Sequence, residues 1–256
     1  MPLVTTPAVI LHVMPYGETS KILRLLTRDL GLQSAIARGA RRPRSPTGPL
    51  LDLFAFGTAS LRVREHRELS PLTGFEIADA HAGIGRDMAR FGAASAVAEL
   101  ALKCAPAERH PAVFDAVAGG LRALARARGE DVEAVGLAAC WALVIALGFS
   151  PTLDRCAGCG TPLEAAGTLH FSAALGGGVC AAHRTGAGAI NTLGAADREA
   201  LAALISGLLP EPALDGRHAA AHRRLLLAFI RHHLAEDRPL PAMVFWDREA
   251  WNATSS

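Results

Sequence analysis

The sequence has no stretch of about 20 apolar residues, which is the length that a helix needs to cross a bilayer. Its longest apolar run covers residues 135–149, and Pro151 follows it closely. The first residues also lack the charged leader, apolar stretch and small-residue cleavage site that a secretory signal combines. We therefore expect a cytoplasmic protein without a membrane anchor.

The short motifs of common nucleotide-using and hydrolytic enzymes are absent too. There is no G-x4-G-K-[ST] loop, no H-E-x-x-H, no G-x-S-x-G and no G-x-G-x-x-G between a strand and a helix. The tripeptide His66-Arg67-Glu68 is similar to the H-x-E of zinc deaminases, but the first C-x-x-C follows about ninety residues later without a preceding proline. We interpret the tripeptide as part of an alternating strand and expect a protein that is not an enzyme.

The chain has neither a strong excess of one charge nor a shortage of apolar residues. Its formal net charge is +2, half of its 256 residues are hydrophobic and a fifth are charged. Such a chain can fill two modest cores, so we expect two domains. Evidence for nucleic-acid binding must come from the distribution of charge along the chain.

The first part of the sequence has the pattern of a small β-barrel. Short β-rich runs alternate with turn residues, and five strands in about 70 residues is the size of an OB-fold. We predict an OB-fold nucleic-acid-binding domain over residues 1–78. The predicted strands cover residues 8–13, 20–27, 32–38, 50–56 and 60–69.

From residue 79 onward the sequence is rich in Ala and Leu at helical spacing. We predict an α-helical domain over residues 79–256, with a zinc-binding segment inserted at residues 153–188; the fold class is therefore α+β with two domains. Asp131 is a candidate N-cap and Gly148 a candidate C-cap. The predicted helices cover residues 91–104, 113–128, 131–148, 195–209 and 218–235.

A pair of short metal-binding motifs lies in the inserted segment. Cys156 and Cys159 form C-x2-C, and Cys180 and His183 form C-x2-H after 20 intervening residues. This spacing is typical of zinc ribbons, in which each short turn directs two side chains to one ion. Four protein ligands leave no position for water, so we predict one structural Zn²⁺.

Other residues with metal-binding side chains are weaker candidates. His170 could replace His183 as the fourth ligand, and chance proximity of buried thiols remains an alternative to a metal site. Cys104 and Cys140 lie within predicted helices, where we expect core positions. His218 and His222 are spaced i, i+4, but without a third ligand nearby we expect them on a solvated helix face.

A positive patch lies at the third predicted strand and the loop that follows it. Acids are sparse between residues 33 and 51, and guanidinium groups pair well with phosphate oxygens. We expect Phe54 and Phe56 to be core residues, so phosphate contacts should dominate binding and make it depend on salt. The predicted DNA-binding residues are Lys21, Arg24, Arg38, Arg41, Arg42 and Arg44; an ordinary solvated loop is the alternative.

Taken together, these residues resemble a known family. The series PYGETS, TRDLGL and ARGARRP, followed by a helical region with C-x2-C and C-x2-H, is similar to RecO, a bacterial recombination mediator. The resemblance covers nearly the whole chain and extends to the HLAEDRPLPAM segment. It implies an OB-fold, a helical domain, a zinc segment and assignment of the six basic residues above to DNA contacts.

The resemblance also implies function and partners. Members of this family anneal complementary strands without enzymatic chemistry, bind single-stranded and also double-stranded DNA, and act with RecR to load RecA onto SSB-coated DNA. They are cytoplasmic and associate with the nucleoid during repair. The acidic SSB C-terminal tail would need an apolar groove edged by cations. Arg122 and Arg126, one helical turn apart, are candidates for that edge, although a solvated helix face explains them equally well.

Two other classes of function remain open from the sequence. A zinc-dependent enzyme acting on nucleic acid would reveal itself by base modification or strand cleavage. A protein-only scaffold, in which the barrel binds a peptide, would reveal itself by failing to bind single strands at low salt.

Overall fold

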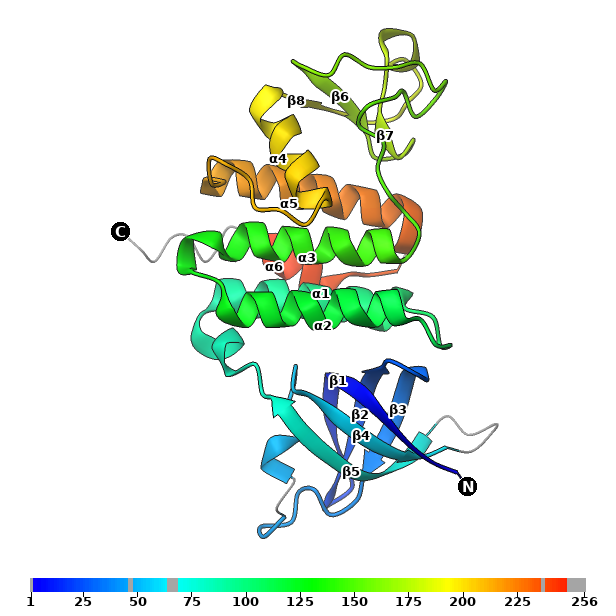
Figure 1. Cartoon of the computed structure of the whole chain (residues 1–256), viewed down its shortest axis with the longest axis vertical. Coiled ribbons are helices and arrows are strands. Elements are labelled where there is room, and N and C mark those ends of the chain that lie inside the picture. Colours follow the sequence, from blue (N-terminus) through cyan, green and yellow to red (C-terminus); the bar gives the residue numbers. More distant parts are fainter. Residues whose placement is uncertain (1, 46–47, 64–68, 236–237, 248–256) are drawn as a thin grey trace.

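The computed structural model of the protein describes residues 2–45, 48–63, 69–235 and 238–247. Its parts are stacked in a row (Figure 1): a β-barrel at one end, layers of helices in the middle and a small three-stranded sheet at the other end. This arrangement confirms the predicted fold class. Within the described residues, no helix is long and apolar enough to span a membrane.

The barrel closes in the order β1-β2-β3-β5-β4, and β3 and β5 pair in parallel. Alternate residues such as Leu23 and Leu25 point inward and meet Ile10, Ala35 and Leu61 in a closed core. The alternation of inward and outward residues along the strands is therefore what fills the barrel. Its strands are β1 (Leu3–Tyr16), β2 (Ser20–Thr27), β3 (Gly31–Ala37), β4 (Phe56–Arg62) and β5 (Leu69–Asp79).

The last two strands differ from the prediction. Residues 50–55 are not a strand, and β4 begins only at Phe56: a 3-10 turn covers Gly48–Leu50, and Phe54 has a positive φ of 68° that interrupts extended backbone. Phe54 N–H still donates to Ile10 O, which anchors the segment to β1. The predicted strand over residues 60–69 was also wrong in its bounds, and His66-Arg67-Glu68 lies outside the described residues.

The helices follow the predicted order with modest shifts. Asp131 is the N-cap residue of α3, as predicted, but its carboxylate accepts from Arg128 Nε at 2.8 Å and makes no capping hydrogen bond to a backbone N–H. Gly148 does adopt the expected left-handed conformation, at φ 95°. The helices are α1 (Met88–Cys104), α2 (Pro111–Arg126), α3 (Val132–Ala146), α4 (Ala195–Ile205), α5 (Gly216–Ile230) and α6 (Pro241–Asp247); a π-helical turn, Arg231–Ala235, continues α5.

Glycines allow the helices to approach closely around one large side chain. Trp246 of α6 is buried against α1 and α3 at Gly92 and Gly136. A Cβ on Gly136 would lie 2.9 Å from the Trp246 ring, which is too close for an ordinary contact. The same core continues into α5, where Phe229 meets Trp141 of α3 at a ring distance of 5.2 Å.

The barrel is fixed to the helices by an apolar seam. Val9, Leu11 and Leu26 on its outer surface share one core with α1 and α2. Phe54 meets Phe91 of α1 edge to face at 5.9 Å. Phe54 and Phe56 were predicted as core residues; Phe54 is buried and Phe56 is partly buried, both at this seam and outside the barrel's interior.

The three-stranded sheet at the far end holds the inserted segment. It has the order β7-β6-β8, formed by β6 (Leu169–Ser172), β7 (Gly177–Gly178) and β8 (Ile190–Leu193). Phe171 of β6 packs on Phe229 of α5, so the segment shares the helical core.

Two histidines are buried between elements. His81 donates from Nδ1 to Phe54 O at 2.9 Å, and its Nε2 lies 3.6 Å from Asp79. The expectation that His222 is solvated was wrong: it is 1% exposed and lies 3.6 Å from Asp197, whereas His218 is exposed. Burial away from water lowers the pKa of both His81 and His222 below the ordinary value.

These shifts predict a loss of stability in acid. Because the folded-state pKa of each histidine is lowered, the unfolded chain binds the proton first, and stability falls as the pH drops below about 6.5. Urea unfolding at several pH values should show this slope, at most about 1.4 kcal/mol per pH unit for each histidine. His81→Asn with His222→Gln should flatten it, and exposed His232→Gln should not; an equally steep slope in the double variant would refute the assignment.

Candidate nucleic-acid interface and metal centre

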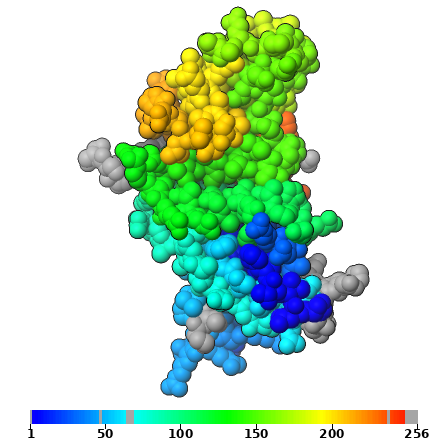
Figure 2. All heavy atoms as spheres, viewed as in Figure 1, coloured from blue at the N-terminus to red at the C-terminus, as the bar shows by residue number. Residues whose placement is uncertain are grey.

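The basic loop projects from the end of the barrel that faces away from the helices. Figure 2 shows the segment between β3 and β4 protruding at the foot of the molecule. Arg38, Arg41, Arg42 and Arg44 are all exposed there. Arg41 donates to Gly17 O at 2.9 Å, which ties the loop to the β1–β2 turn. The other three guanidinium groups make no hydrogen bond or ion pair within the described part of the chain.

Lys21 has a different environment from the arginines. It follows the inward parity of Leu23 and Leu25, and its Nζ donates to Gly48 O at 2.8 Å and to Leu51 O at 2.9 Å. The ammonium group therefore closes the end of the barrel and holds the start of the β3–β4 crossing segment. The inward position of Lys21 could have been predicted from the sequence, because residue 21 lies two and four positions before the buried Leu23 and Leu25 in β2.

Arg24 lies on the outer face of β2, opposite His12 of β1 and Ser34 of β3. Its Nε is buried without a hydrogen-bond partner among the described residues. The same face carries Met14 and Tyr16, which are 39% and 54% exposed. We did not predict these two as site residues, although their alternate positions after the buried middle of β1 place both on one face.

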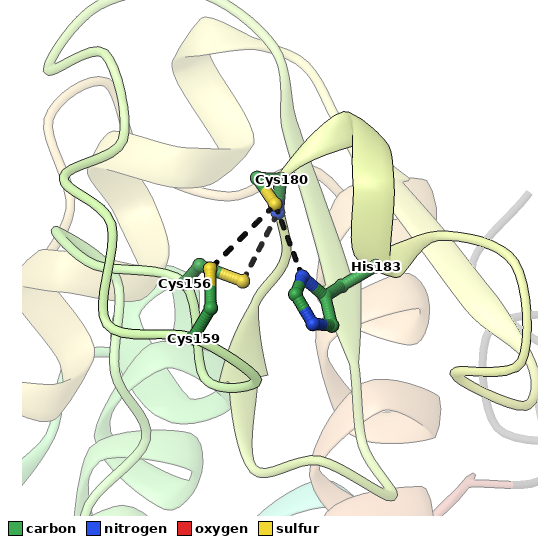
Figure 3. A group of neighbouring side chains, drawn as sticks. All are labelled: Cys156, Cys159, Cys180 and His183. Carbon is green, nitrogen blue, oxygen red and sulfur yellow. Dashed lines mark hydrogen bonds between the residues drawn. The ribbon is translucent and has the colours of Figure 1, made fainter.

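The four predicted metal ligands lie together at the opposite end of the molecule (Figure 3). Their ligand atoms all lie within 4.8 Å of one another. The sulfurs of Cys159 and Cys180 are 3.9 Å apart, and Cys180 Sγ is 3.3 Å from His183 Nδ1. A tetrahedral ion with bonds of about 2.3 Å to sulfur needs sulfurs about 3.8 Å apart. Three sulfurs and one imidazole nitrogen thus fit one metal ion.

Local backbone geometry prepares these side chains for a metal. The Cys180 N–H donates to Cys156 Sγ at 3.4 Å, and this bond, which favours the thiolate, lowers the pKa of Cys156 to about 6. Gly158 leaves room for the imidazole, since a Cβ there would lie 2.7 Å from His183 Cδ2. The turn over Ala181–His183 brings His183 back beside Cys180.

His170, the alternative fourth ligand, is engaged elsewhere. Its Nε2 lies 3.1 Å from Arg184 Nη1 and its Nδ1 lies 3.3 Å from Thr192 Oγ1. Cys140 is buried in α3 and Cys104 is half-buried at the end of α1, so neither approaches the cluster. Within the described residues, Cys156, Cys159, Cys180 and His183 are the one group that could hold a metal ion.

Arg122 and Arg126 lie on α2 beside the seam. The Arg122 guanidinium lies 5.5 Å from the centre of the Phe56 ring, and Arg126 lies 3.5 Å from Asp79 at the end of β5. Both side chains therefore contact the barrel, although they remain exposed.

Known proteins resemble this chain over both of its parts. The family model described as Recombination protein O N terminal matches residues 1–81, and Recombination protein O C terminal matches residues 85–241. The chain belongs to the RecO family. The DNA repair protein RecO of Anaeromyxobacter dehalogenans is 34% identical over 250 residues, covering 93% of this chain and 94% of that protein. The RecO of Bifidobacterium adolescentis is 37% identical over 188 residues, covering 72% of this chain and 75% of that protein.

The boundary between the two family matches coincides with the change from β-strands to α-helices. The first ends just after β5, and the second begins just before α1. The basic loop lies in the first match and the metal cluster in the second.

Lys21 and Arg38 offer a test of their different roles. Lys21→Ala should lower the free energy of unfolding by about 1–3 kcal/mol, because two buried carbonyls lose a charged donor. Arg38→Ala, which removes an exposed side chain, should change it by less than about 0.5 kcal/mol. Urea unfolding measures both; a Lys21→Ala variant as stable as wild type but weaker in DNA binding would assign Lys21 to DNA instead.

The metal cluster predicts a loss of stability when one ligand is removed. Wild-type protein should carry about one zinc per chain, and Cys156→Ser should lose most of it. The unfolding midpoint should fall by a few degrees or more, since about 1 kcal/mol corresponds to about 2–4 °C at this size. His170→Ala should keep both metal and midpoint. A fully stable, metal-free Cys156→Ser protein would exclude a structural metal.

Proposed function

We propose that this protein is a DNA repair protein of the RecO type that binds single-stranded DNA at the free end of its barrel. The observation that carries the proposal is the cluster of exposed, mostly unpaired arginines on the β3–β4 loop. The seam with α1 and α2 covers the side of the barrel that carries Val9, Leu11 and Leu26, and the β3–β4 loop lies outside this seam. Family membership and the names of the relatives support the same reading.

Strand annealing follows from this mode of contact. Guanidinium groups neutralise phosphates and lower the repulsion between two strands, while the base edges stay free to pair. Tyr16 and Met14 would add an apolar surface on which bases can stack beside Arg24. Double-stranded DNA would bind through the same phosphate contacts with little preference for sequence.

The partners proposed for this chain are those of the RecO family. It would act with RecR in the bacterial cytoplasm, associate with the nucleoid during repair, and help RecA to load onto SSB-coated DNA. For the acidic SSB tail we keep Arg122 and Arg126 as candidate contacts. Arg122 stacks on Phe56 and Arg126 pairs with Asp79, so a tail bound there would compete with contacts of the seam.

The proposed metal is one structural Zn²⁺, and the proposed function needs no catalytic step. Cys156, Cys159, Cys180 and His183 would supply four ligands, which suits an ion that stabilises a fold better than one that activates water. When bound, the ion would join the Cys156 loop to the turn after β7 and so stiffen the end of the molecule opposite the barrel.

The salt dependence of DNA binding tests the barrel site. Arg38→Ala, Arg41→Ala and Arg42→Ala together should weaken binding to oligothymidylate and reduce the slope of log K against log salt by about 2, at about 0.7 per phosphate contact on a single strand. The matched control is Arg86→Ala, Arg109→Ala and Arg128→Ala, which removes the same charge from exposed positions outside the barrel. If the loop variant keeps the slope of the control, the loop is not the phosphate-binding surface.

A further inference from the structure

A line of arginines runs along the open side of α5. Most positions of this helix are buried, including Leu226, Phe229 and Ile230 in the shared core. The solvent side repeats at helical spacing and carries Arg217, Ala221, Arg224, Ala228 and Arg231, with the three arginines exposed. We call these five residues the α5 stripe.

The arginines of the stripe have no acidic partner. Their guanidinium groups make no hydrogen bond or ion pair within the described residues. The helix itself contains no Asp or Glu, and Asp215 at its N-cap is already bonded to His218. By contrast, the buried Arg223 of the same helix pairs with Glu133 and stacks on Trp246. Nothing in the described structure neutralises the stripe.

The spacing of the stripe suits an extended polyanion. Residues seven apart on a helix rise by about 10 Å, so the three arginines extend over about 20 Å. That is the length of about six base pairs of duplex at 3.4 Å each. Ala221 and Ala228 separate the cations with short side chains, which lets a phosphate backbone approach the helix closely.

The stripe is remote from the barrel site. The barrel packs on α1 and α2, α3 packs on both of these helices, and α5 lies beyond α3 toward the metal-binding end (Figure 1). The basic loop projects from the opposite end of the molecule. Nucleic acid on the stripe therefore would not compete for space with a strand held at the barrel.

We propose that the α5 stripe is a second nucleic-acid surface that binds the phosphate backbone of another strand or of a duplex. This second surface is distinct from the barrel site. Its use in annealing, where one molecule must hold two strands, rests on the proposed function. An acidic protein segment is the less favoured occupant, because the stripe offers only alanines and no apolar groove for anchoring side chains.

The test uses the full chain with Arg217, Arg224 and Arg231 all changed to Gln, alone and combined with the Ala changes at Arg38, Arg41 and Arg42. A second variant changes the three stripe arginines to Lys, and Arg86→Gln with Arg109→Gln and Arg128→Gln removes the same charge elsewhere. Labelled oligothymidylate and a labelled duplex are titrated at several salt concentrations, and annealing of complementary oligonucleotides is timed.

When Arg38, Arg41 and Arg42 are already Ala, the three Gln changes should lower the remaining DNA affinity about tenfold at low salt. They should also reduce the slope of log K against log salt by about 2. With an intact barrel they should leave binding of the first strand nearly unchanged but slow annealing about tenfold. The Lys variant should behave as wild type, since the contact depends on charge.

If the Gln variant binds DNA and anneals strands as well as the charge-matched control, the proposal is overturned. An acidic protein partner would then be the remaining occupant of the stripe. An equal loss in the Lys and Gln variants would also overturn the proposal, because that would indicate damage to α5 and not loss of charge. Failure of the barrel site is a separate result: the Ala changes alone would then leave affinity for oligothymidylate intact.

Discussion

Apolar side chains on the outer surface of the barrel are buried against α1 and α2, and this contact decides which part of the barrel stays accessible. Val9, Leu11 and Leu26 belong to the helical core, so the barrel surface around them is packed against the helices. Gly31 allows the β2–β3 turn to press against the α1–α2 connection, where a Cβ would lie 2.3 Å from Glu108 O. The open half is where the basic loop, Arg24 and Tyr16 lie.

The two ends of the molecule differ in their chemistry. At the barrel end, the arginines of the β3–β4 loop are exposed and mostly unpaired, which favours a negatively charged ligand. At the other end, four convergent ligands enclose a site for one ion, and Phe171 links that segment to the core of α5. The helices between the ends, centred on Trp246, hold them at a fixed separation.

Parts of the fold and site that depend on local pattern could be predicted from the sequence. The inward parity of Leu23 and Leu25 and the paired C-x2-C and C-x2-H motifs are local, and the structure places these residues as their spacing indicates. Features that depend on distant contacts could not. Residues 50–56 are apolar and β-rich, but the positive φ at Phe54 and its contact with Phe91 exclude a strand before Phe56. His222 of α5 has a polar side chain yet is buried beside Asp197 of α4, and the local spacing of the sequence does not reveal this contact.

The central claim is that DNA lies across the open half of the barrel, along the β3–β4 loop and the outer face of β1 and β2. Photo-crosslinking of the full chain to an oligothymidylate with a reactive base at each position in turn, followed by peptide mapping, tests it most directly. The account predicts crosslinks at Tyr16 and within residues 38–45, and none at the seam residues Val9 and Leu26. Crosslinks confined to the helices, with none on the barrel, would contradict it.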